Sequence, residues 1–126
     1  MCDANVIISI DLKKYRIRIH RCTLAVLENP PFVQLLVNPE TMQIAVRGLD
    51  QKLLDAYKVK EASETDHCYE LYSKSLVNKL RELLPQMLEG ETYRFTGSVL
   101  QDKKIAVFPM TSLQRVDVSG GNVYGG

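Results

Sequence analysis

The clearest pattern in this sequence is the alternation of cationic and apolar residues over positions 13–21, KKYRIRIHR. Successive side chains of a β-strand point to opposite faces, so this alternation predicts a strand. Tyr15, Ile17 and Ile19 would face a core on one side of the sheet. The other side would carry Lys14, Arg16, Arg18 and His20. The strand therefore offers one apolar face and one face suited to anions or to water.

Other strands are predicted from runs of β-branched and aromatic residues that are bounded by turn residues. They cover residues 6–12, 32–37, 41–47, 53–59, 67–72, 93–100, 104–108 and 113–118. The sequence Asn38-Pro39-Glu40 predicts a tight turn, because proline presets φ and asparagine can hydrogen-bond the backbone that follows it. The two strands that flank this turn are therefore predicted to form a hairpin.

Two helices are predicted between these strands. Thr23 is expected to cap a short helix, which the Asn-Pro-Pro sequence after it must end. Ser73 or Ser75 is expected to cap a second helix, because four leucines recur at helical spacing over residues 76–84. Pro85 should end or kink this second helix, since proline lacks the N–H that continues the ladder.

The two halves of the chain repeat the same order of elements. IRIHRCTLAVL in the first half matches YELYSKSLVNKL in the second, which places Thr23 over Ser75. The following hairpins also match, with Ile-Ala-Val at positions 44–46 over the same tripeptide at 105–107. Each half would then be a β-α-β-β-β unit, and neighbouring units of this kind can share one sheet.

The length of 126 residues suits one domain with its own core. We predict a single α+β domain over residues 1–118, with halves at 5–60 and 67–118 joined by a polar linker at 60–66. Its sheet would be largely antiparallel, with both helices on one face. The Gly-rich residues 119–126 are predicted to form a flexible tail.

A tandem pair of such units, with helices capped by Ser or Thr, resembles one domain of the DNA sliding clamps. The second half is the more similar, where SKSLVNKLRELL is followed by EGETYRFTGSVLQDKKIAVFPM. The resemblance covers most of residues 15–118 and implies a clamp-like domain. It also implies helices that present basic residues to DNA phosphates without reading bases. On the second helix Lys74, Asn78 and Arg81 would form that face, and Arg21 leads into the first helix.

Charge limits the kinds of partner. The net charge is +1, so no overall field attracts nucleic acid, and any preference for anions must come from a local patch. One candidate patch is the strand face with Lys14, Arg16 and Arg18, and the other is the helix face. A strand face of this kind can also serve only to keep an outer strand soluble.

These patches give a leading hypothesis and an alternative. The leading hypothesis is a non-enzymatic, DNA-associated module that contacts the phosphate backbone without sequence specificity, so its affinity would depend on salt. The alternative is a protein-interaction or scaffold module that self-associates through sheet edges and does not bind nucleic acid.

Catalytic and metal signatures are missing from the sequence. It has no Gly-rich phosphate loop, no Gly-x-Ser-x-Gly elbow and no His-Glu-x-x-His, so we expect neither enzymatic activity nor a cofactor. His20, Cys22, His67 and Cys68 lack the ligand spacing of structural zinc sites, although they could supply a Cys/His nucleophile pair. The ordinary role of such a cysteine is packing.

The cysteines also bear on location. Three cysteines without paired spacing argue against a disulfide framework and for a reducing compartment, so we expect the cytoplasm. No apolar stretch approaches the roughly 20 residues that span a bilayer, so we expect no membrane association.

Overall fold

The computed structural model describes residues 6–54, 56–59, 68–100 and 104–116. Half of these residues, 50%, lie in strands and 19% lie in helices. The strands are β1 (Val6–Asp11), β2 (Arg16–His20), β3 (Phe32–Asn38), β4 (Gln43–Leu49), β5 (Ala56–Lys58), β6 (Cys68–Tyr72), β7 (Thr92–Leu100), β8 (Ile105–Pro109) and β9 (Gln114–Val116). The helices are α1 (Arg21–Val26), α2 (Lys74–Leu83) and a 3₁₀ turn (Met110–Ser112).

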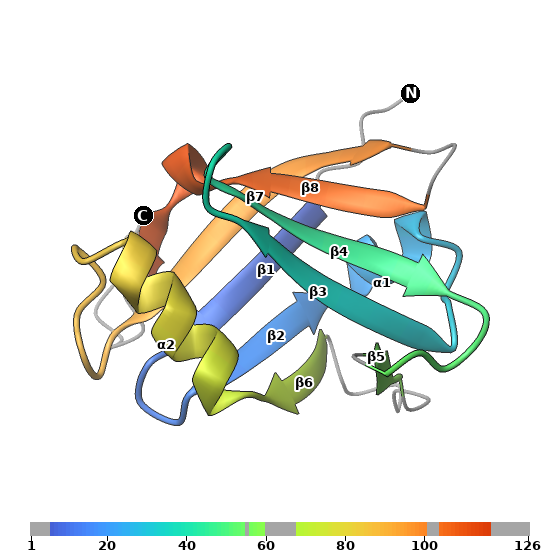
Figure 1. The fold of residues 1–126 in the computed structure, drawn as a ribbon, viewed down its shortest axis with the longest axis horizontal. Helices are drawn as coiled ribbons and strands as arrows, with labels where there is room; N and C mark the ends of the chain where they lie inside the picture. The colour runs from blue at the N-terminus through green and yellow to red at the C-terminus, as the bar shows by residue number, and fades with distance from the viewer. Residues whose placement is uncertain (1–5, 55, 60–67, 101–103, 117–126) are drawn as a thin grey trace.

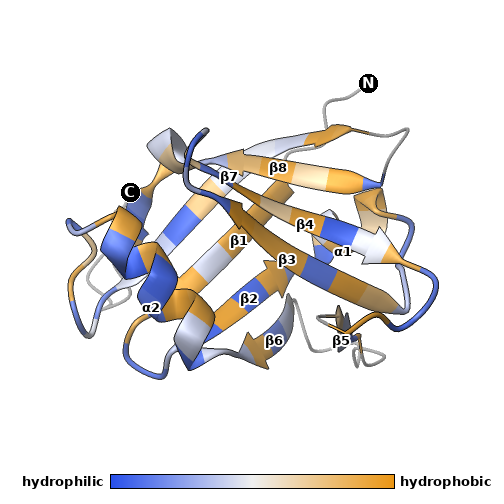
Figure 2. Ribbon diagram, in the orientation of Figure 1, coloured by the Kyte–Doolittle hydropathy of each residue, from blue (hydrophilic) through white to orange (hydrophobic). Residues whose placement is uncertain are grey.

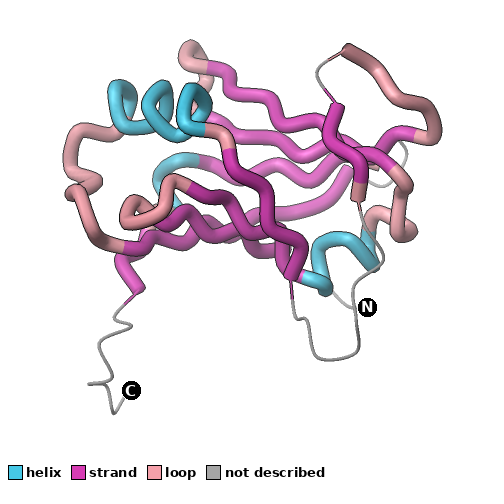
Figure 3. Tube along the Cα trace, turned by 90° about the horizontal axis from the view of Figure 1, so that it is seen from below, coloured by secondary structure: helices cyan, strands magenta, loops and turns pink. Residues whose placement is uncertain are grey.

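The strands form one antiparallel sheet that curls into a nearly closed barrel (Figure 1). Their order is β5-β3-β4-β8-β7-β1-β2-β6, and β9 pairs with β7. The predicted clamp-like α+β fold with both helices on one face is therefore wrong. Twist curls a long antiparallel sheet toward closure, and each helix then covers a different side of the barrel, as Figure 3 shows.

The strand order has an internal two-fold relationship. If β5 and β6 are counted as neighbours that close the barrel, exchanging β1 with β5, β2 with β6, β3 with β7 and β4 with β8 gives the same strand order read in the opposite direction. Under this exchange the β1–β7 ladder corresponds to the β5–β3 ladder, and the β3–β4 hairpin corresponds to the β7–β8 hairpin. The β2–β6 and β4–β8 ladders each correspond to themselves. The repeating unit is therefore β-β-α-β-β, and not the predicted β-α-β-β-β. Among the described residues the β1–β2 and β7–β9 ladders have no counterpart. The counterpart of β1–β2 would be a ladder between β5 and β6, and we call the gap between these two strands the seam.

Alternation along the strands builds the core. In β1 and β2 the inward residues are fully buried: Val6, Ile8, Ile10, Ile17 and Ile19. Their outward neighbours on β2 are polar, and Figure 2 shows the resulting bands of hydrophilic and hydrophobic residues along this strand. The predicted alternation is confirmed here, although β2 begins at Arg16 because the residues before it form a turn in which Tyr15 has a φ of 53°.

The long strand β7 turns a corner of the barrel at Gly97. Its first part pairs with β1 and β9, and its last part pairs with β8. A Cβ at Gly97 would overlap the carbonyl oxygen of Val107, so only glycine lets the strands approach this closely. Between β8 and β9 the chain leaves the ladder, and the hydroxyl of Ser112 accepts a 3.1 Å hydrogen bond from the N–H of Thr96 in its place.

The helix starts agree only in part with the sequence patterns. Ser73 caps α2, and its hydroxyl accepts a hydrogen bond from the N–H of Leu76. Thr23 does not cap α1, which begins at Arg21 without a side-chain cap. The hydroxyl of Thr23 instead bonds both main-chain groups of Ile7, at 2.7 Å from its N–H and 2.9 Å to its carbonyl. Thr23 therefore fastens α1 to β1.

The first hairpin forms as predicted. The side chain of Asn38 accepts hydrogen bonds from the N–H groups of Glu40 and Thr41, at 2.9 and 3.3 Å, and β3 pairs with β4 on either side. The predicted linker at 60–66 and tail at 119–126 lie outside the described residues. Within the described ranges, no helix combines the length and apolar character needed to cross a membrane.

Candidate functional site

The outer face of β2, β1 and β7 carries a set of basic side chains. Arg18 lies opposite Ser9 in the β1–β2 ladder, and Ser9 lies opposite Arg94 in the β1–β7 ladder. One row of outward positions therefore runs across three strands. We call the residues Arg16, Arg18, His20 and Arg94 the basic sheet face.

Two of its arginines are paired with carboxylates. The Nε of Arg16 lies 2.9 Å from Asp11, and its Nη1 lies 3.4 Å from Glu70. The Nε of Arg18 lies 3.0 Å from the other oxygen of Glu70. Burial by itself would raise the pKa of Asp11, but hydrogen bonds from the Lys13 N–H and from Arg16 outweigh it and lower that pKa below its usual value. Asp11 therefore stays ionised.

Arg94 is the residue of this face that sequence patterns missed. Its Nε is buried and has no hydrogen-bond partner, and no ion pair to Arg94 occurs within the described ranges. The signal that could have found it is the alternation in β7, where Tyr93 and Phe95 point into the core and so turn Arg94 outward. Its guanidinium charge is consequently not neutralised by a neighbouring carboxylate in this part of the chain.

His20 completes the face as an uncharged group at neutral pH. Its Nε2 lies 2.9 Å from the hydroxyl of Ser9. Burial, and then the charges of Arg94 and Arg18, lower the pKa of His20 below its ordinary 6.5. The imidazole can therefore donate or accept a hydrogen bond here without adding to the positive charge.

The basic residues of α2 are engaged in contacts within the protein. The Nη1 of Arg81 lies 2.7 Å from Glu89 and donates a 2.8 Å hydrogen bond to the hydroxyl of Tyr15. The ammonium of Lys74 lies 5.9 Å from the ring centre of the same tyrosine. These contacts join α2 to the turn between β1 and β2. Asn78 is not part of this group, because it lines a cleft beside the helix.

The seven predicted phosphate-binding residues therefore do not form one surface. Arg16 and Arg18 point outward from β2, whereas α2 buries Val77 and Leu80 in the core on the inner side. Lys14 is exposed in the turn before β2. Arg21 is exposed at the first position of α1.

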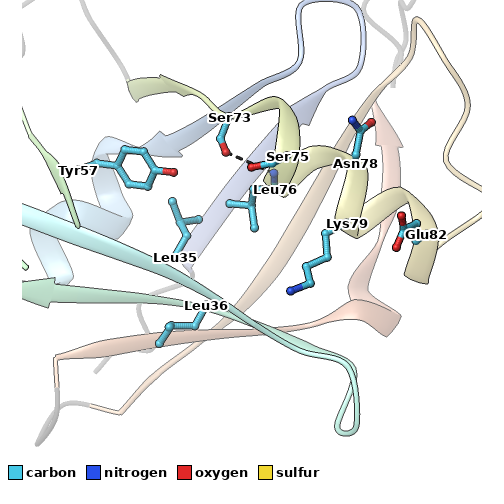
Figure 4. Close-up of a pocket in the computed structure, with 9 residues that line it drawn as sticks. All are labelled: Leu35, Leu36, Tyr57, Ser73, Ser75, Leu76, Asn78, Lys79 and Glu82. Atoms are coloured by element: carbon cyan, nitrogen blue, oxygen red, sulfur yellow. Dashed lines mark hydrogen bonds between the residues drawn. The ribbon is translucent and has the colours of Figure 1, made fainter. Parts of the chain in front are cut away.

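A cleft of about 500 Å³ lies between α2 and the strands β3 and β5 (Figure 4). It is lined by Leu35, Leu36, Tyr57, Ser73, Ser75, Leu76, Asn78, Lys79 and Glu82. Aliphatic and aromatic side chains form one wall, and polar side chains of the helix form the other. We call this the seam cleft, because it lies where β5 and β6 lack a ladder. No sequence pattern pointed to it.

The cysteine and histidine residues are the candidates for a zinc site or for a Cys/His nucleophile pair. Within the described ranges no three His, Cys, Asp or Glu side chains gather as metal ligands. Cys22 is exposed on α1, and His67 lies outside the described residues. The positions of His20 and Cys68 are opposite each other in the β2–β6 ladder. No zinc site is therefore assembled from the side chains that are described.

Comparison with known proteins adds no family to these observations. No protein-family model, no curated protein and no solved structure matches this chain. Function is therefore inferred from the geometry of the basic sheet face.

Proposed function

We propose that this protein is a non-enzymatic module that binds the phosphate backbone of DNA through the basic sheet face. The observation that carries the proposal is Arg94, whose guanidinium lacks a carboxylate partner within the described ranges and shares a row with Arg18. A guanidinium presents forked donors that match a phosphate. A phosphate bound beside Arg94 would neutralise the positive charge that the carboxylates of this face leave.

The face as a whole has an excess of positive charge. In the part of the chain that the structure describes, the carboxylates paired on this face are Asp11 and Glu70, so the three arginines Arg16, Arg18 and Arg94 leave one positive charge unneutralised. Backbone contact of this kind reads no bases, because it uses charge and not base edges. The helix is the weaker candidate, since Arg81 and Lys74 already contact Glu89 and Tyr15.

The alternative function, self-association through sheet edges, is less well supported. The strands at the ends of the sheet are short, with three residues in β5 and five in β6. Short edges offer few main-chain groups to a second copy. Size-exclusion chromatography with light scattering weighs this alternative, because a dimer that fails to bind DNA would favour it. We further propose a reducing, cytoplasmic setting, given the unpaired spacing of the three cysteines.

Fluorescence anisotropy with labelled duplex and single-stranded DNA, at two salt concentrations, tests the proposal. We expect binding that ignores sequence and weakens steeply as salt rises. Arg94→Gln should weaken binding to every DNA and lower the salt slope by about 1, because one phosphate contact is lost. Arg94→Glu should weaken it further.

The matched control is Arg47→Glu, which makes the same charge change at an exposed position on β4. It should bind DNA as the wild type does. A second control, Lys74→Glu on α2, should also leave binding unchanged. Equal losses in the Arg94 and Arg47 variants would show a general charge effect and overturn the site. Failure of the wild type to bind at low salt would overturn the function.

A further inference from the structure

The charge of His20 can change near neutral pH, whereas the arginines of the basic sheet face stay protonated. His20 is half-buried at the last position of β2. Its Nε2 lies 2.9 Å from the hydroxyl of Ser9, and Ser9 is itself buried on β1. This contact holds the imidazole against the sheet, next to the row that contains Arg18 and Arg94.

Two positive charges act on this imidazole from different strands. Arg18 precedes His20 by two residues on β2 and points to the same side of the sheet. Arg94 reaches the same place from β7, because it lies opposite Ser9 in the β1–β7 ladder. Burial, and then the charges of Arg94 and Arg18, lower the pKa of His20. The free protein therefore holds the ring in its neutral form at a site where cations surround it.

The nearby carboxylates are paired with other residues. Glu70 on β6 contacts Arg18 and Arg16, and Asp11 on β1 contacts Arg16. No ion pair joins His20 to a carboxylate among the described residues. The remaining titratable or charged residues on the described elements that adjoin His20 are Cys68, opposite it in the β2–β6 ladder, and Arg21 and Cys22 at the start of α1. A proton on His20 thus has to be balanced by an anion from outside this group.

We propose that binding of a phosphate anion at the basic sheet face is coupled to protonation of His20, so that affinity rises as the solution becomes more acidic. The coupling rests on the proposed function, because it takes the same face as the anion site. An anion beside Arg94 would offset the positive charges that oppose a proton on His20. The protonated ring would in turn add a positive charge beside the anion.

The two effects are one linkage and must be equal in size. The anion raises the pKa of His20 by the same free energy by which the proton strengthens anion binding. The affinity should therefore rise as pH falls through the pKa of the complex. The rise should be complete below the pKa of the free protein, which lies under the ordinary 6.5.

The first test measures the pKa of His20 in the wild-type protein by NMR of its imidazole, with sodium sulfate and with sodium chloride at equal ionic strength. Sulfate keeps one charge state across this pH range, so any difference comes from the protein. We expect sulfate to raise the pKa of His20 above its value in chloride. In Arg94→Gln the pKa in chloride should be higher than in the wild type, because one opposing charge is gone, and sulfate should raise it less.

The second test measures binding of labelled oligothymidine by fluorescence anisotropy, since neither thymine nor the phosphodiester titrates in this range. We expect the wild type to bind about threefold more tightly at about pH 5.5 than at about pH 8. His20→Gln should bind weakly at both, and His20→Arg, with its permanent charge, tightly at both. The chain has two histidines, so His67→Gln is the matched control and should keep the pH dependence of the wild type.

The outcomes separate this coupling from the proposed function. The coupling is overturned if sulfate leaves the pKa of His20 unchanged, or if His20→Gln keeps the full pH dependence of binding. DNA binding that is equal at both pH values would also overturn it, but would leave the proposed function standing. Failure of the wild type to bind DNA at either pH would overturn the proposed function, whereas a pKa of His20 that sulfate raises would still support coupling to an anion.

Discussion

The hydroxyl of Tyr69 donates a 2.7 Å hydrogen bond to the main-chain carbonyl of Lys58 and thereby connects the two ends of the sheet. Tyr69 lies on β6 and Lys58 on β5, between which no ladder is recorded in the described residues. Burial, and then the proximity of Tyr57, raise the pKa of Tyr69 above its ordinary 10.0. The hydroxyl therefore remains a hydrogen-bond donor throughout the neutral range.

Tyr69→Phe should loosen the seam. The change removes one hydrogen bond and should lower the free energy of unfolding by about 1 kcal/mol. Because the folded state raises this pKa, the contribution is present below pH 10 and is lost as pH rises through the folded pKa. Urea denaturation measures the difference, and hydrogen exchange should quicken at β5 but not at β7. Uniform quickening in both strands would contradict a role confined to the seam.

Asp11→Asn should destabilise the protein only where the carboxylate is ionised. The pKa of Asp11 is lowered in the folded state, so its contribution is present above the ordinary value of 3.8 and is lost as pH falls through the folded pKa. We expect the variant to lose about 2 kcal/mol at neutral pH, since a partly buried charge pair with Arg16 is removed. Urea denaturation at neutral and acidic pH checks this, because the gap between the two proteins should narrow in acid.

Thr23→Val should weaken the attachment of α1 to β1. Valine keeps the shape of threonine but leaves the N–H and carbonyl of Ile7 without their hydrogen bonds in a fully buried place. We expect a loss of about 2 kcal/mol in the free energy of unfolding. Thr111→Val, at an exposed position, is the matched control and should change stability little. Similar losses in both variants would show that the bonds to Ile7 contribute nothing particular.

Gly97→Ala should be among the most disruptive single substitutions. An added methyl group would overlap the carbonyl of Val107, so β7 and β8 would have to separate at the corner of the barrel. Overpacking of this kind costs about 3 kcal/mol, and more where the neighbour is backbone. Thermal denaturation followed by circular dichroism checks this against Ser98→Ala, which alters the next, exposed residue. A melting temperature equal to that of Ser98→Ala would refute the close approach.

The candidate site could be predicted only in part. Alternation in the sequence placed Arg16 and Arg18 on one outer face, and the structure keeps them there. It could not reveal that Asp11 and Glu70 neutralise them, or that Arg94 joins them, because these residues come from other strands. Nor could it reveal that Glu89 and Tyr15, which come from outside the helix, contact the basic residues of α2.

The sequence by itself determined the local order of the protein. Periodicity and turn residues are short-range signals, and they identified the alternating core of β2 and the hairpin at Asn38. They also narrowed the cap of α2 to Ser73 or Ser75, of which the structure uses Ser73. The repeat also matched Arg18 with Glu70, which the structure places opposite each other at the centre of the β2–β6 ladder, 3.0 Å apart.

Tertiary structure alone decided the barrel. Which strands pair depends on contacts between distant segments, and the strand order β5-β3-β4-β8-β7-β1-β2-β6 follows from twist and from burial of inward side chains on every strand. That order separates the two helices and leaves a seam where Tyr69 replaces a ladder. The two copies of the repeat also differ in their helix contacts, because Thr23 on α1 bonds Ile7 of β1 whereas Ser75 on α2 lines the seam cleft.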